Sequence, residues 1–233
     1  MRHPIASLLA LCCAAVSHPA IAQRAAAPVP AILLTAHAAG LADTRVADDL
    51  EASGFGRAAT LMPYLGVDLA GAAGRSRYGL EFGVLWQPDR TDGRDGRSQQ
   101  TGAYTFTATY GLSVATVARG TLIPTIGIGG THRYTQLRGG TGTADRSSWS
   151  AYRNNPGRES TLHTSTGSVD LGMRWQWTAR AGAVGFVREL RAGYRLPAWG
   201  DRPSVDGTDL AGGPRARSAV WYAGLGFGIG RAP

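Results

Sequence analysis

From residue 57 onward, apolar residues alternate with polar or small residues, which is the period of a β-strand. In the segment 103–115, Tyr104, Phe106 and Leu112 share one face, whereas Thr105 and Gly111 lie on the other. No helical period competes with these runs. The alternation predicts seven strands, near residues 57–70, 77–87, 102–115, 120–135, 163–178, 183–196 and 217–230.

The connections between these segments alternate in length. The short ones lie near residues 71–76, 116–119 and 179–182. The long ones, rich in Gly, Asp, Arg and Ser, lie near residues 88–101, 136–162 and 197–216. This alternation is typical of transmembrane β-barrels, whose turns are short on one side and long on the other. Continued backwards, it predicts a loop over 43–56 and an eighth strand near 30–41; a disordered or helical leader over 23–42 remains the alternative.

The face opposite the apolar one carries four acidic and four basic residues. In a soluble barrel the apolar face points inward, whereas in a membrane barrel it points to lipid. Isolated charges inside a barrel would be costly, but opposite charges can pair across a narrow lumen. We therefore predict a lumen filled by paired charges rather than an open pore. The charges are Asp68, Glu81, Arg133, Asp170, Arg174, Glu189, Arg191 and Arg195.

Bulky aromatic residues occupy the ends of the predicted strands. A bilayer selects two such girdles, one at each interface. Toward the long loops lie Trp86, Tyr104, Tyr134, Tyr194 and Trp221. Toward the short turns lie Tyr78, Trp175, Trp177 and Phe227. The sequence thus predicts an all-β fold: an antiparallel up-and-down transmembrane β-barrel of eight strands, with short periplasmic turns and long extracellular loops.

Arg188 conflicts with this pattern, because it falls on the lipid-facing parity between Phe186 and Leu190. An arginine at mid-depth on that face would cost about 2–4 kcal/mol. A β-bulge that shifts the register, or a local loss of membrane contact, would remove the conflict.

The composition excludes two other classes of protein. Hydrophobic residues make up 43% of the 233 residues and charged residues only 17%, which argues against disorder and against a coiled coil. The formal net charge is +8, and every basic residue other than histidine is arginine. The arginines are scattered rather than aligned on one face, so we expect no nucleic-acid binding. Attraction to anionic glycolipid headgroups is the more natural consequence.

The first 22 residues have the layout of a cleavable signal peptide. A basic start, Met1–His3, precedes the apolar run Ile5–Val16, and Ala20 and Ala22 form a cleavage site before Gln23. The barrel domain is then residues 23–233, exported to the outer membrane. Both cysteines lie within the leader, so the mature chain has no disulfide.

The pattern over residues 57–230 resembles that of the small eight-stranded outer-membrane barrels, the OmpA/OmpX-like group. In the last strand, Tyr222, Gly224, Phe227 and Ile229 resemble the signal recognised by the barrel-assembly machinery. The resemblance implies a monomer whose partners are outer-membrane lipid, lipopolysaccharide and that machinery during insertion. Members of the group are anchors, adhesins, complement-evasion factors or narrow pores, and a few are enzymes, so the fold leaves the function open.

One pair of residues suggests catalysis. His163 and Ser165 are two apart and share a strand face, so the imidazole could act as a general base on the hydroxyl. The pair resembles the His-x-Ser of the lipid A 3-O-deacylase family, and Glu159 is the nearest carboxylate that could orient the histidine. That family has Asn where this chain has Thr166, and its carboxylate follows the pair. The alternative is that these are ordinary polar residues at a strand end.

Other chemistry is weakly indicated. The aspartates of segment 88–96 are spaced by three and interleaved with arginines, unlike a calcium loop, and the histidines are far apart. We therefore predict no metal and no cofactor. The long loops hold aromatic residues and arginines, a common binding composition; these are Arg138, Arg146, Trp149, Tyr152, Arg153, Arg158, Trp199 and Arg202. We expect a non-enzymatic structural or surface-binding protein, with a lipid A esterase or a narrow channel as alternatives.

Overall fold

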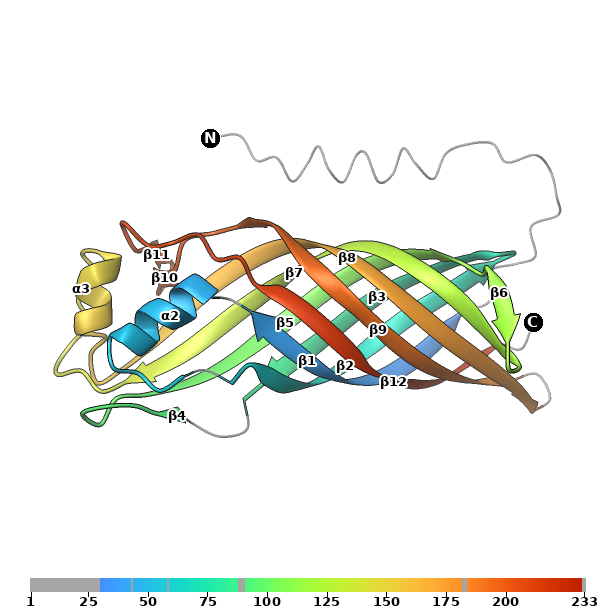
Figure 1. The fold of residues 1–233 in the computed structure, drawn as a ribbon, viewed down its shortest axis with the longest axis horizontal. Coiled ribbons are helices and arrows are strands. Elements are labelled where there is room, and N and C mark those ends of the chain that lie inside the picture. Colours follow the sequence, from blue (N-terminus) through green and yellow to red (C-terminus); the bar gives the residue numbers. More distant parts are fainter. Residues whose placement is uncertain (1–29, 43, 58, 88–90, 182–183, 232–233) are drawn as a thin grey trace.

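Eight long antiparallel strands form a barrel in the computed structural model (Figure 1). The structure describes residues 30–231 except 43, 58, 88–90 and 182–183, so the predicted signal peptide lies outside the described residues. The strands are β1 (Ala31–Ala42), β2 (Leu61–Ala73), β3 (Ser76–Trp86), β5 (Ser98–Leu112), β7 (Gly120–Arg138), β8 (Glu159–Ala181), β9 (Val184–Gly200) and β12 (Ala219–Arg231).

The first and last strands close the barrel. β1 pairs with β2 and, from Ala31 opposite Gly230 to Ala42 opposite Ala219, with β12. The prediction of an eighth strand near residues 30–41 is therefore confirmed. Its pattern was hard to recognise because both faces are largely apolar: Leu33 is buried in the lumen, whereas its neighbour Leu34 is exposed outside.

The two ends of the barrel differ. One end has the short turns, including the hairpin between β6 (Ala115–Val117) and β7, and also the start of β1 and the end of β12. The other end has the long loops, with the short strands β4 (Thr91–Asp92), β10 (Ser204–Val205) and β11 (Thr208–Asp209). By the rule for outer-membrane barrels, the first end is periplasmic and the second extracellular.

Two helices in the long loops were missed by the sequence prediction. The loop expected over residues 43–56 contains α2 (Thr44–Ala52), and the loop between β7 and β8 contains α3 (Trp149–Asn154). In α2, Val46 and Leu50 are four residues apart and share a buried face. Such short helices add little to a pattern search dominated by period two. Within the described residues, neither helix is long and apolar enough to cross a membrane.

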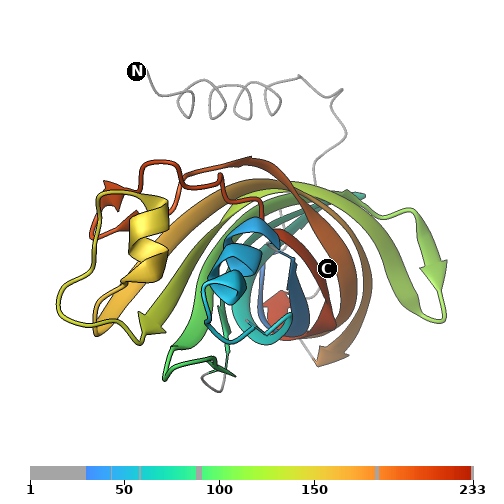
Figure 2. The same ribbon diagram turned by 60° about the vertical axis from the view of Figure 1, so that its left-hand side comes forward.

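The two helices and the loop ends of the strands share a hydrophobic core, which we call the cap core. Figure 2 shows both helices at the same end of the barrel. Because its members come from three separate parts of the chain, residues 46–55, 137–162 and 205–210, these long loops form a folded unit rather than independent loops. The cap core comprises Val46, Leu50, Phe55, Leu137, Trp149, Tyr152, Leu162, Val205 and Leu210.

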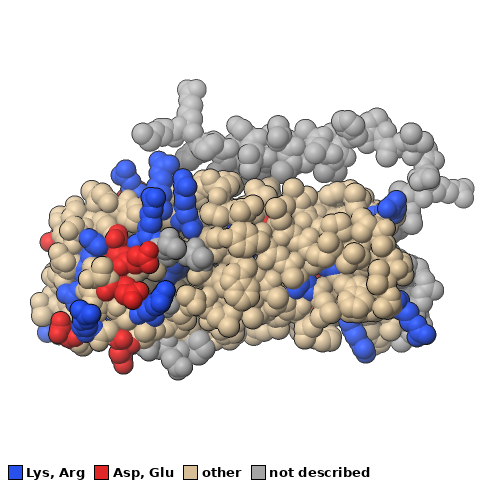
Figure 3. Space-filling view, viewed as in Figure 1, with Lys and Arg blue, Asp and Glu red and all other residues tan. Residues whose placement is uncertain are grey.

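The barrel exterior between its ends is apolar. In Figure 3 the middle of the visible face is almost free of charged side chains, which gather at the two ends. Leu34, Phe227 and Ile229 are more than half exposed, whereas the eight predicted lumen charges are buried inside. A soluble protein rarely exposes so large an apolar belt. This reversal of inside and outside is expected of a barrel surrounded by lipid.

Arg188 lies on the outside of this belt, and the bulge explanation is wrong. The register of β8 with β9 is unbroken from Val169 to Ala181, and its only shift in the described pairs lies at Gly167/Ser168. Arg188 pairs with Trp177 and Phe227, four residues from the periplasmic start of β9. From there a long guanidinium side chain can reach toward the periplasmic interface.

Candidate functional site

The structure places all eight predicted lumen charges in the interior, where each is buried. Arg191 is the centre of the group. Its guanidinium lies 2.8 Å from Asp68, 2.9 Å from Glu81 and 2.6 Å from Glu189. Arg174 contacts the same oxygen of Asp68, at 2.8 Å. One arginine of β9 thus connects carboxylates from β2, β3 and its own strand.

A second ion cluster surrounds Arg195. Its Nε lies 3.0 Å from Asp170 Oδ2, and its Nη2 lies 3.5 Å from Glu81 Oε2. The Tyr222 hydroxyl donates to the other oxygen of Asp170 at 2.8 Å. Because Glu81 contacts both arginines, the two clusters form one continuous network.

The eight lumen charges are four carboxylates and four guanidinium groups, so their formal charges sum to zero. Opposite charges that share hydrogen bonds offset the cost of removing them from water. Beside these charges the lumen holds an apolar cluster, which we call the upper lumen layer. It comprises Ala39, Leu41, Met62, Tyr64, Leu85, Ala103, Val220 and Tyr222. The two groups interlock, since Val220 is the cross-strand partner of Arg195 and Ala103 that of Arg133.

The predicted girdle residues lie on the outward face at both ends. At the periplasmic end Tyr78 and Phe227 are about half exposed, and the rings of Trp175 and Trp177 are 4.2 Å apart. Toward the loops lie the exposed Tyr104, Tyr194 and Trp221 and the partly buried Trp86 and Tyr134. The rings of Tyr104 and Tyr134 are 5.5 Å apart.

Ser165 is hydrogen-bonded to His132, a residue that the sequence pattern does not single out. Its Oγ lies 3.0 Å from Nδ1 of His132, on the neighbouring strand β7. His132 Nε2 lies in turn 3.2 Å from Nδ1 of His163. The structure therefore brings His163 and Ser165 together through His132.

Glu159, the predicted orienting carboxylate, does not join this cluster. It lies at the extracellular start of β8, where Arg138 Nη2 donates to its Oε1 at 2.9 Å. His132 was missed because a sequence cannot show which residue of a neighbouring strand faces Ser165 across a long loop. The available signal was that His132 has the outward parity of Ile126 and Ile128.

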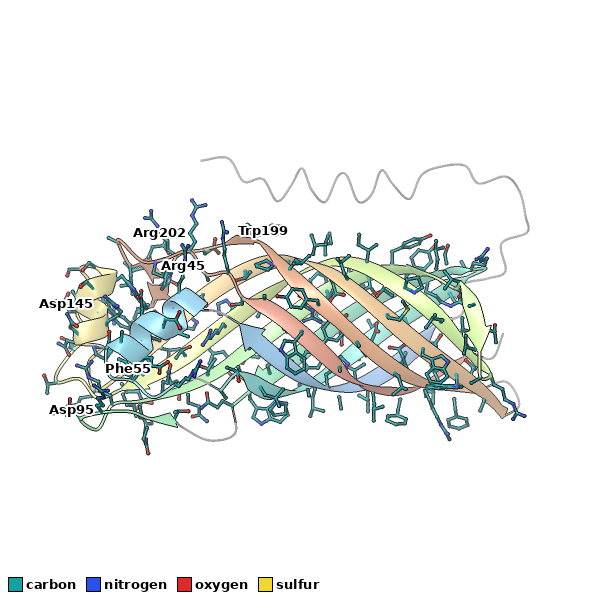
Figure 4. The ribbon with its side chains drawn as sticks, viewed as in Figure 1. Arg45, Phe55, Asp95, Asp145, Trp199 and Arg202 are labelled. Carbon is teal, nitrogen blue, oxygen red and sulfur yellow. The ribbon has the colours of Figure 1, made fainter. Side chains whose placement is uncertain are left out.

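Exposed arginines surround the extracellular end. Figure 4 shows Arg45, at the start of α2, and Arg202, beyond β9, pointing away from the barrel near its rim. Arg215 and Arg217 are also exposed there. In the described part of the chain, no cluster of three or more His, Cys, Asp or Glu residues has the geometry to hold a metal ion.

The closed strands, apolar exterior and charge-filled lumen define a small eight-stranded outer-membrane β-barrel. No protein-family model and no curated protein sequence matches the chain. The chain is similar to three solved structures over 86–88% of its length. The first is Ail, the attachment invasion locus protein of Yersinia pestis, with 10% identity, 97% of that chain covered and a TM-score of 0.46. The second is Neisserial surface protein A, with 13% identity, 98% of that chain covered and a TM-score of 0.42. The third is a major outer membrane protein from Thermus thermophilus, with 12% identity, 99% of that chain covered and a TM-score of 0.44.

Proposed function

We propose that this protein is a closed, non-conducting scaffold in the outer membrane that displays a folded, arginine-rich cap. The observation that carries the proposal is the buried ion network centred on Arg191. Side chains from β2, β3, β8 and β9 meet across the lumen, and Asp68, Glu81 and Arg191 are nearly inaccessible to water. An eight-stranded barrel is just wide enough for side chains to fill it, so no continuous water column crosses this level.

Bilayer recordings test the closed lumen. The full chain, inserted into a planar lipid bilayer, is expected to give no conductance steps, while a porin added to the same bilayer gives regular ones. Regular steps from the wild-type barrel would contradict the proposal and favour the narrow channel.

For the cap, we propose binding to the phosphate groups of lipopolysaccharide. Arg45, Arg202, Arg215 and Arg217 are exposed at the end of the barrel that the lipid headgroups surround. Replacing Arg45 and Arg202 by Ser is expected to weaken salt-dependent binding of purified lipopolysaccharide. The matched control is Arg119→Ser, an exposed arginine at the periplasmic end. Equal binding of lipopolysaccharide by both variants would show that Arg45 and Arg202 are not part of the binding site.

Export and insertion complete the proposal. Residues 1–22 direct export, the last strand engages the barrel-assembly machinery, and the two aromatic girdles hold the monomer at its depth. A heat-dependent mobility shift of the outer-membrane fraction on a gel tests insertion, and absence of the protein from that fraction would contradict it.

A further inference from the structure

The outward faces of β7 and β8 bring one serine and two histidines into a hydrogen-bonded chain. Ser165 Oγ lies 3.0 Å from His132 Nδ1, and His132 Nε2 lies 3.2 Å from His163 Nδ1. Nucleophilic catalysis requires a nucleophile that is hydrogen-bonded to a base, and a third group that is hydrogen-bonded to the base and orients it. We propose that these residues form a hydrolytic site that cleaves an acyl ester of an outer-leaflet lipid.

Of the two proton placements that satisfy both contacts, one makes His132 a base, and the proposed reaction uses that one. Ser165 donates its hydroxyl hydrogen to Nδ1 of His132, and His132 donates its Nε2–H to Nδ1 of His163. His132 then presents an unprotonated nitrogen to the serine. His163 is a positioning residue, because its lone pair holds His132 in this tautomer.

Strand register fixes the cluster. Ser165 and His132 are direct cross-strand partners, and His163 is the next outward residue of β8. Direct partners lie about 4.5–5.5 Å apart at Cβ, and diagonal ones remain within reach of long side chains. Two long paired strands therefore hold the three side chains, rather than a loop, which favours the precise geometry that catalysis needs.

The depth of the cluster indicates the substrate. On its other side His132 pairs with Tyr104, an exposed residue of the extracellular girdle. Aromatic girdles lie at the level of the headgroups, where acyl chains are joined to them. A carbonyl that reaches Ser165 from the lipid side therefore belongs to an ester between headgroup and acyl chain.

The segment after β9 runs beside the site and adds a positive charge. The backbone N–H of Asp201 donates to the carbonyl oxygen of Ser165 at 2.9 Å, and Ser204 pairs with His163. This places Arg202 next to the serine, with its side chain directed outward at the loop end of the barrel (Figure 4). A guanidinium there suits the phosphate of a lipid headgroup.

Trp199 supplies a donor for the developing oxyanion. Its indole lies over Gly167, which is two residues from Ser165 on the same outward face. A methyl group at Gly167 would overlap this ring, so glycine is required for the approach. The indole nitrogen is among the ring atoms nearest Gly167, so it lies beside the strand face on which the ester carbonyl would lie.

The reaction is an ester hydrolysis with water as the second substrate. Ser165 Oγ attacks the carbonyl carbon as its proton passes to His132 Nδ1. The bond to the headgroup oxygen breaks, that oxygen takes the proton from His132, and the alcohol leaves. Water then gives a proton to His132, attacks the acyl–Ser165 ester and releases the fatty acid as Ser165 regains its proton.

The test uses the full barrel in vesicles and measures released fatty acid by mass spectrometry. One set of vesicles contains lipopolysaccharide with phosphatidylethanolamine, and the other contains phospholipids alone. Release only in the first set identifies lipid A as the substrate, and release in the second identifies phospholipid; both support the site. No release in either set, with no labelling of Ser165 by a fluorophosphonate probe, overturns it.

Variants assign the roles. Ser165→Ala is expected to reduce release to the vesicle background, and His132→Ala to reduce it by about 10²–10⁴-fold. The control is Ser76→Ala, an outward serine at the periplasmic end whose hydroxyl faces Tyr110 rather than a histidine. A heat-dependent gel shift verifies that each variant folds. Folded Ser165→Ala with wild-type release would refute the proposal.

The role of His163 needs a second measurement. His163→Ala is expected to shift the acidic limb of the pH–rate profile, because the tautomer of His132 is no longer held. An unchanged profile would show that His163 is not a positioning residue.

Discussion

Arg191 and Glu81 face each other inside the barrel, with 2.9 Å between Nη1 and Oε1, although 110 residues separate them in the sequence. Arg191 also contacts Asp68 and Glu189. Removing one partner from a buried ion network leaves the remaining charges uncompensated. Arg191 therefore contributes more to stability as the partner of three carboxylates than as an isolated ion pair would.

We expect Arg191→Met to reduce the free energy of unfolding by about 3–5 kcal/mol, because three carboxylates lose their shared partner. Urea unfolding in vesicles, followed by the gel shift, measures the change. The matched control is Arg158→Met, an exposed loop arginine, which should alter stability by less than about 0.5 kcal/mol. Equal changes in the free energy of unfolding for the two substitutions would show that the network does not stabilise the barrel.

The two helices of the cap are joined by Asp49, whose Oδ2 accepts from Trp149 Nε1 at 2.7 Å and whose Oδ1 lies 3.3 Å from Arg153. Asp49→Ala leaves the indole N–H without this partner, at a cost of about 1–3 kcal/mol. We expect faster proteolysis of the loops and an unchanged gel shift. Asp48→Ala, an exposed neighbour on the same helix, is the control. Similar proteolysis of both variants would contradict the role of Asp49.

Tyr152 makes the cap sensitive to alkali. Burial in the cap core raises the pKa of its phenol to about 12, although the hydrogen bond with Ser160 acts in the opposite direction. The unfolded cap has the ordinary value of about 10. A raised folded pKa stabilises the neutral form, so this contribution is complete below pH 10 and is lost as the pH rises toward 12.

The measurement is proteolysis of the cap as a function of pH. Wild-type loops should become more susceptible between about pH 10 and 12, and Tyr152→Phe should lack this component. Subtracting the variant removes the effects of other tyrosines and of protease activity. Identical pH dependence in both proteins would disprove the link to Tyr152.

The sequence predicts those features of the barrel that depend on neighbouring residues, and not those that depend on the pairing of distant ones. Alternation along a strand is local, so the inward parity of Arg191 and the outward parity of Tyr104 could be read from neighbouring residues. β1 was inferred from topology, because Leu33 and Leu34 on opposite faces do not alternate in polarity. The pairing of His132 with Ser165 depends on register across a loop that contains α3, and no local pattern encodes that register.

Arg188 provides the last test, because depth determines the cost of a charge on the lipid face. It lies near the periplasmic end, in a shallow groove shared with Arg119 and Phe227. There the cost of an arginine falls to about 0–1 kcal/mol. We expect Arg188→Leu to change the free energy of unfolding by less than about 1 kcal/mol, whereas Leu225→Arg, nearer the middle of β12, should cost about 2–4 kcal/mol. Chemical unfolding in vesicles compares the two substitutions. A gain of several kcal/mol from Arg188→Leu would mean that this guanidinium does not reach the interface.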